Sequence, residues 1–220
     1  MDQLDERHYF VTPVYMVKKP EFLPAVSEVS QKYLAKSRAR KKSKNPIVVM
    51  SGSYMAEPAV APFAQYVSQT AWNILSAQGY KMKDMVTYFT EMWTQEHNTM
   101  SSMETHVHGH GVQLSCFYFL DVPENSSKVV IHDPRPGKLM GHLYPEEPRK
   151  VSMAAHQIVF KPEPGLMIFL NSWVPHSFTK NLGKGPLRFV HMNLAVTLSP
   201  EALKAAQEGK KPTEKAVEVL

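Results

Sequence analysis

The 220-residue sequence predicts a mainly β protein: a double-sheet jelly roll with flanking N-terminal helices and one short C-terminal helix. From Met85 onward, short apolar runs alternate with breaks rich in Pro, Gly and Asn. Strands do not alternate with helices, and no internal repeat is present. Many short strands separated by turns are typical of a jelly roll.

The chain is expected to form one domain in three parts, because its hydrophobic content of 43% shows no compositional break. Residues 1–84 are expected to form a first strand and packing helices. Residues 85–198 are expected to form the jelly-roll catalytic core. Residues 199–220 are expected to form a C-terminal helix and tail.

The N-terminal part contains signals for one strand and two helices. Residues 8–17 are β-branched but contain a proline, which favours an edge strand. Apolar residues at helical spacing predict helices over residues 20–36 and from Pro62 to Gly79. We expect both helices to pack on the outside of a sheet.

Seven strands are predicted in the core, at residues 86–94, 103–120, 128–132, 152–160, 166–170, 176–180 and 188–198. After them, Ser199 is the expected N-cap of a short helix that stops at Gly209. A charged tail follows.

Composition limits the classes of partner that we expect for this chain. The net charge is +5, but the densest basic run, residues 36–44, lacks interleaved aromatics and is interpreted as a solvated loop rather than a nucleic-acid site. No apolar run approaches the roughly 18 residues of a membrane span, and the first residues do not resemble a signal peptide. A single cysteine, Cys116, suits a reducing compartment. We therefore expect a soluble, cytoplasmic protein with no membrane partner.

Histidines occupy alternate positions in one predicted strand. His106, His108 and His110 are each separated by one residue, and His176 follows a proline 68 positions after His108. Alternate side chains of a strand share a face, so two or three imidazoles can converge on one cation while a distant strand supplies another ligand. This pattern predicts a metal site.

An arginine extends the pattern. Arg188 lies 12 residues beyond His176, in the neighbouring predicted strand. An iron enzyme that binds an organic diacid needs three protein ligands, open metal positions and an arginine for the far carboxylate. His191 and Asn193 have the opposite parity to Arg188 and are expected to point away from its face.

At these motifs the chain resembles the iron(II)- and 2-oxoglutarate-dependent oxygenases, and among them those of bacteriophages of marine cyanobacteria. The host cytoplasm is the expected location in that case. The resemblance is carried, in order, by TPVY at 12–15, EMWT at 91–94, HVHG at 106–109, LSCFYFL at 114–120, IHDPRPGK at 131–138 and PGLMIFLNSWVPHSF at 164–178.

The resemblance implies a double-stranded β-helix, a cupin-like jelly roll, in which His106, His108 and His176 hold Fe(II) and form the catalytic centre. Arg188 would bind the distal carboxylate of 2-oxoglutarate, and molecular oxygen would be the oxidant. The co-substrate leaves as succinate and CO2, and the substrate is usually hydroxylated. Tyr118 shares the parity of His106 and His108, so its hydroxyl is expected to reach the co-substrate unless it is a core aromatic.

His108 departs from the wider superfamily, which has a carboxylate ligand there. Glu104 or Asp133 could supply a carboxylate instead, directly or by orienting an imidazole. Three neutral nitrogen ligands also occur in cupin-type dioxygenases that use no 2-oxoglutarate. A third alternative is a non-catalytic jelly-roll module with structural zinc, in which His110 is the fourth ligand.

The primary substrate is not predicted, since enzymes of this type act on peptides, nucleobases, sugars and small metabolites through loops that one sequence does not define.

Overall fold

The structure is a computed structural model that describes residues 4–40, 46–141, 143–148 and 150–208. Its strands are β1 (Val14–Lys18), β2 (Val48–Met50), β3 (Met85–His97), β4 (Met103–His106), β5 (Leu114–Asp121), β6 (Val129–His132), β7 (Gln157–Phe160), β8 (Leu166–Asn171), β9 (His176–Phe178) and β10 (Leu187–Leu198). Its helices are α1 (Leu23–Ala39), α2 (Ala61–Ala77), α3 (Pro136–Leu139) and α4 (Pro200–Gln207), with 3-10 turns η1 (Pro20–Phe22) and η2 (Pro58–Val60).

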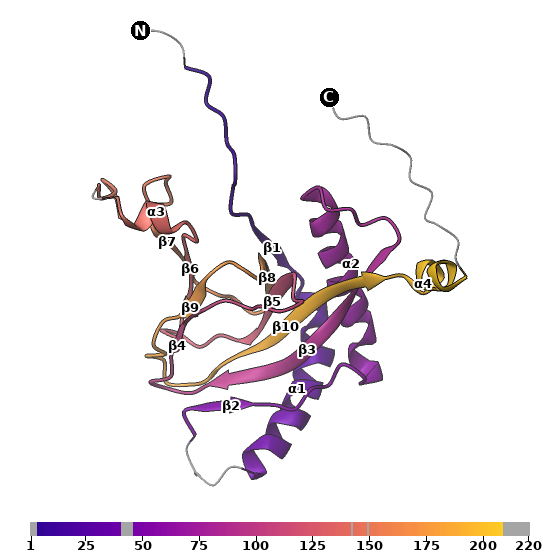
Figure 1. Cartoon of the computed structure of the whole chain (residues 1–220). Coiled ribbons are helices and arrows are strands. Elements are labelled where there is room, and N and C mark those ends of the chain that lie inside the picture. Colours follow the sequence, from indigo (N-terminus) through magenta and orange to yellow (C-terminus); the bar gives the residue numbers. More distant parts are fainter. Residues whose placement is uncertain (1–3, 41–45, 142, 149, 209–220) are drawn as a thin grey trace.

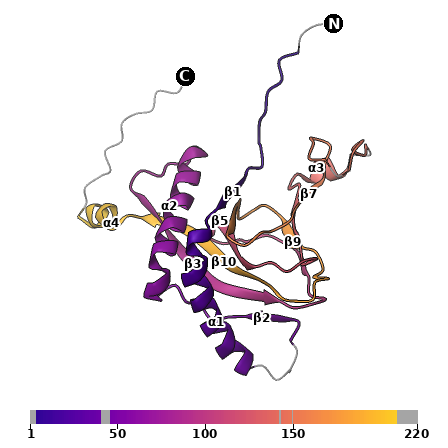
Figure 2. The same cartoon turned by 180° about the vertical axis from the view of Figure 1, so that it is seen from behind.

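The strands form two antiparallel sheets. The larger has the order β1-β8-β5-β10-β3-β2 and the smaller the order β4-β9-β6-β7. Helices α1 and α2 lie on the side of the large sheet that faces away from the small one (Figures 1 and 2). The predicted mainly β jelly roll with flanking helices is confirmed.

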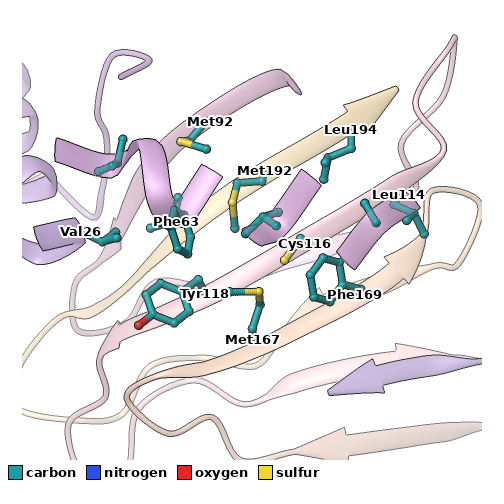
Figure 3. Packing of buried hydrophobic residues seen from close by; sticks show 14 of the residues in the cluster. Val26, Phe63, Met92, Leu114, Cys116, Tyr118, Met167, Phe169, Met192 and Leu194 are labelled. Atoms are coloured by element: carbon teal, nitrogen blue, oxygen red, sulfur yellow. The ribbon is translucent and has the colours of Figure 1, made fainter. Parts of the chain in front are cut away.

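The large sheet is buried on both faces because it separates two apolar cores. Along β5, Cys116 and Tyr118 face the helices and pack near Phe63 of α2 (Figure 3). The alternate residues Phe117 and Phe119 face the small sheet. A residue's parity in this sheet therefore decides whether it can reach the space between the sheets.

The long helices begin close to their predicted starts, each after a proline-containing 3-10 turn. Burial in the helix-side core raises the pKa of the Cys116 thiol well above its usual range, consistent with an inert cysteine. None of the described helices has the length and apolar character that crossing a membrane requires.

The first strand is shorter than expected. It begins at Val14, whereas the expectation was residues 8–17, and the residues before it are mostly exposed. Strand β2, only three residues long, was not predicted. The C-terminal helix begins as predicted, with the Ala202 N–H donating to Ser199 Oγ. The predicted tail beyond residue 208 lies outside the described residues.

The predicted strand at residues 103–120 is in fact two strands in different sheets. A turn over residues 107–113 separates β4 from β5, and Gly111 adopts a φ of +88° in it. That conformation favours glycine. The turn places β4 in the small sheet and resets the parity of β5 relative to it.

Candidate metal centre

Three predicted histidines converge between the sheets. Each of His106, His108 and His176 offers one ring nitrogen, and these atoms lie within 4.8 Å of one another. The ring centroids are 4.4 Å apart for His106 and His176, and 5.2 Å apart for each pair that includes His108. Among the described residues this group alone combines potential ligands at such distances.

Two strands and a turn place these rings. His106 at the end of β4 is the cross-strand partner of His176 at the start of β9. His108 lies beyond β4, where its backbone N–H donates to Ser172 O at 2.9 Å. The turn before β9 thus holds the third histidine beside the other two.

Hydrogen bonds to backbone carbonyls fix two of the rings. His106 Nδ1 is 2.8 Å from Glu104 O, and His176 Nδ1 is 3.0 Å from Val174 O. A carbonyl oxygen only accepts, so Nδ1 donates and Nε2 keeps its lone pair. The Nε2 atoms of His108 and His176 are buried without a hydrogen-bond partner among the described residues. Such atoms are costly unless a ligand meets them, so the residues fit a bound cation.

The buried rings resist protonation. Burial lowers the pKa of His108 to about 4, and the neighbouring His106 acts in the same direction. Burial likewise lowers the pKa of His176 to about 4. At neutral pH both side chains are therefore uncharged and can offer lone pairs to a metal.

Two polar residues that were expected to point away from the face of Arg188 lie around His108. The amide nitrogen of Asn193 lies 3.2 Å from His108 Nδ1, and the ring of His191 lies 5.1 Å from that of His108. His191 also packs against Trp93 at 4.8 Å, and its Nε2 is 3.8 Å from Glu91 Oε2. Both Asn193 and His191 are 3% exposed.

Arg188 does not lie with the histidines, contrary to expectation. Its neighbour Phe189 faces the space between the sheets, so Arg188 faces the helix side. There its Nε donates to Glu96 Oε2 at 2.6 Å, and its Nη1 donates to Asp121 Oδ2 at 2.9 Å. Glu96 is also paired with Arg38 of α1. The expected opposite parity of Arg188 and His191 is present, but His191 is on the histidines' side.

Tyr118 is also placed elsewhere. Its hydroxyl donates to Lys19 O at 2.7 Å, and its ring packs against Phe63 at 5.0 Å on the helix side (Figure 3). The alternative of a core aromatic residue is the one observed. The expectation failed because the turn before β5 breaks the parity that was counted from His108.

The alternative ligands do not join the cluster. Asp133 accepts bonds from Arg135 Nε at 2.9 Å and Nη2 at 2.7 Å. Glu104 contributes its backbone carbonyl, and its side chain is outside the group of ligand atoms. His110 is exposed and is also outside that group. A closed zinc site with His110 as fourth ligand is therefore not formed by these residues.

A cavity lies between the N-terminal segment and strands β6 and β7 of the small sheet. It has a volume of about 350 Å³ and is lined by residues 7–12, 14, 131–135, 152, 153 and 155–158. Its lining includes Ile131, the cross-strand partner of His176, but none of the three clustered histidines.

Comparison with known proteins points to iron- and 2-oxoglutarate-dependent oxygenases. Residues 91–190 match the model of a family described as "Putative 2OG-Fe(II) oxygenase". The matched segment contains all three histidines. No curated protein matches the chain in sequence.

Solved structures share the fold at low identity. A Pseudomonas putida prolyl-4-hydroxylase has a TM-score of 0.55 at 8% identity, covering 84% of this chain and 93% of its own. AviO1 from Streptomyces viridochromogenes has a TM-score of 0.58 at 11% identity, covering 87% and 91%. The epimerase SnoN, in complex with Fe3+, alpha ketoglutarate and nogalamycin RO, has a TM-score of 0.50 at 13% identity, covering 95% and 89%.

The family match, the fold and the three-histidine cluster together support an enzyme of the 2-oxoglutarate- and iron(II)-dependent oxygenase type. They agree with the predicted cofactors, iron and 2-oxoglutarate. The resemblance to bacteriophage enzymes stays a prediction.

Proposed function

We propose that the protein is an Fe(II)- and 2-oxoglutarate-dependent dioxygenase that hydroxylates its substrate and releases succinate and CO2. The convergence of three imidazoles, two of them with buried and unpaired Nε2 atoms among the described residues, is the observation that carries the proposal. The family match over residues 91–190 supports the co-substrate.

In this proposal, His106, His108 and His176 hold the iron. When bound, iron would activate molecular oxygen, and 2-oxoglutarate would supply two electrons. Backbone carbonyls hold the His106 and His176 rings with Nε2 available. Arg188 does not fit as the anchor of the distal carboxylate, because its guanidinium pairs with Glu96 and Asp121 on the helix side.

The test is succinate formation by protein that was loaded anaerobically with Fe(II) and then given 2-oxoglutarate and air. Wild type should show slow turnover without added substrate, and His176→Ala should show none above the metal-free background. His110→Ala is the matched control, because this exposed histidine belongs to the same run but not to the cluster. Equal turnover in wild type and His176→Ala would refute the proposal.

A second candidate is a three-histidine dioxygenase that uses no 2-oxoglutarate. It is favoured by two observations: all three candidate ligands are imidazoles rather than carboxylates, and Arg188 pairs with Glu96 away from them. Iron-loaded wild type that neither binds 2-oxoglutarate nor forms succinate would support this candidate.

A further inference from the structure

We infer that Asn193 is the positioning residue of the third histidine: its amide fixes the ring of His108, while Ser115 and Glu91 fix the amide. The inference rests on the metal centre proposed above. It assigns a role to buried polar groups of the large sheet that the proposed function does not use.

Each histidine of the cluster has a partner at Nδ1, but His108 obtains its partner differently. His106 and His176 each bond to the carbonyl two residues earlier in their own chain segment. His108 lies past the end of β4, and its Nδ1 meets the side-chain amide of Asn193 on the opposite sheet. The orientation of this ring therefore depends on a side chain that can be replaced.

Three strands hold Asn193 in place. It lies in β10 and is paired with Glu91 of β3 and Ser115 of β5. Ser115 Oγ donates to Asn193 Oδ1 at 2.8 Å, and Asn193 Nδ2 donates to Glu91 Oε2 at 2.6 Å. A buried amide with partners on both arms is fixed in position beside the imidazole ring, so it can support that ring.

An amide can serve both protonation states of the ring. With Nδ2 toward His108, Nδ1 accepts and the ring proton is on Nε2. A cation at Nε2 requires the proton on Nδ1, and a half-turn of the amide presents Oδ1 as its acceptor. In that orientation Nδ2 donates to Ser115 Oγ, and the Glu91 carboxylate must turn away from Oδ1, which its 41% exposed side chain can do. A leucine of similar size can do neither.

The experiment titrates the full chain with Co(II) alone. Asn193→Leu should bind Co(II) about 10- to 100-fold more weakly than wild type, the usual effect of losing a partner behind a metal ligand. The visible absorption at saturating Co(II) should also change, because the His108 ring is no longer held. Asn171→Leu is the matched control: Asn171 is also buried, at 4% exposure, but bonds to Gln78. It should keep the wild-type affinity and spectrum.

A double-mutant cycle separates positioning from general damage. If Asn193 acts through His108, Asn193→Leu should cause no further loss of Co(II) affinity in His108→Ala protein. Ser115→Ala, which removes little volume, should weaken binding in the same direction and serves if Asn193→Leu does not fold.

The outcomes distinguish this inference from the proposed function. If wild type does not bind Co(II), the metal centre itself is refuted, and the inference with it. If wild type binds and Asn193→Leu matches Asn171→Leu, or if its effect persists without His108, the inference alone is overturned.

Discussion

Arg188 forms ion pairs on both sides of its strand, and their removal should affect stability rather than co-substrate binding. Glu96 is 4% exposed in its side chain and is bound by Arg188 and Arg38. In Arg188→Ala, Arg38 still partly compensates the buried carboxylate, so we expect a loss of about 2 kcal/mol in the free energy of unfolding, below that for an uncompensated charge. Urea denaturation measures it.

The same variant should bind 2-oxoglutarate as wild type does once Fe(II) is present. Arg38→Ala is the control, because it removes the other arginine from Glu96. A stable Arg188→Ala protein that has lost 2-oxoglutarate binding would restore the role expected from the sequence.

His97 should make stability depend on pH. It is 1% exposed among Phe178 and Phe189, and burial lowers its pKa to about 4. Its unfolded pKa is about 6.5, so the unfolded chain takes up the proton first as pH falls. The contribution of uncharged, buried His97 to the free energy of unfolding is therefore complete above about pH 6.5. It is lost progressively toward pH 4, by about 3 kcal/mol.

The measurement is the free energy of unfolding between pH 7 and pH 4 for wild type and His97→Phe. Wild type should lose more stability than the variant over this interval. Parallel curves would mean that His97 is not the group responsible.

At the residue scale, the alternate spacing of His106 and His108 is a local property that predicted a shared face, whereas the family resemblance was needed to choose His176 from a distant strand and to leave out His110. The sequence could not place Arg188. Strand β10 is buried on both faces over most of its length, so hydropathy does not reveal which parity faces the small sheet.

At the scale of elements, one glycine allows the turn before β8 to lie very close to the start of the first helix. Gly165 has a φ of +80°, and a Cβ there would lie 3.0 Å from Pro20 Cα. Its N–H donates to Phe119 O, and its carbonyl accepts from the Lys19 N–H. Gly165→Ala should therefore lower the free energy of unfolding by about 2 kcal/mol or more, through strain and displacement of the helix start.

Gly79→Ala is the control that measures the cost of the backbone conformation alone, without a steric contact. Gly79 has a φ of +89°, but a Cβ added there would meet no other part of the described chain within 4 Å. The substitution should cost about 1 kcal/mol. Equal costs for the two variants in denaturation experiments would contradict a role for the Pro20 contact.

The helices and most strands could be predicted because apolar periodicity and proline or glycine signals mark them locally. The turn at residues 107–113 was not predicted, although Gly109 and Gly111 are a local signal for it, because the alternation of the histidines was interpreted as one continuous strand. Its position depends on backbone contacts with the turn before β9, including the bond from His108 N–H to Ser172 O. That missed turn explains the wrong expectation for Tyr118.

At the scale of the whole molecule, two apolar cores lie on opposite faces of the large sheet. The helix-side core contains Tyr118 and the Val and Phe residues of α1 and α2, whereas the core between the sheets contains the phenylalanines beneath the histidines. The metal centre thus lies between the small sheet, whose strands β4 and β9 carry His106 and His176, and the helix-backed large sheet, which carries Asn193 and His191.

The most direct test of the account is an anaerobic equilibrium titration of the wild-type chain with Fe(II), followed by 2-oxoglutarate. The account predicts one ion per chain, 2-oxoglutarate binding only after the ion, and loss of both in His176→Ala. Absence of a specific ion site in wild type, or 2-oxoglutarate binding that is independent of the ion, would contradict it.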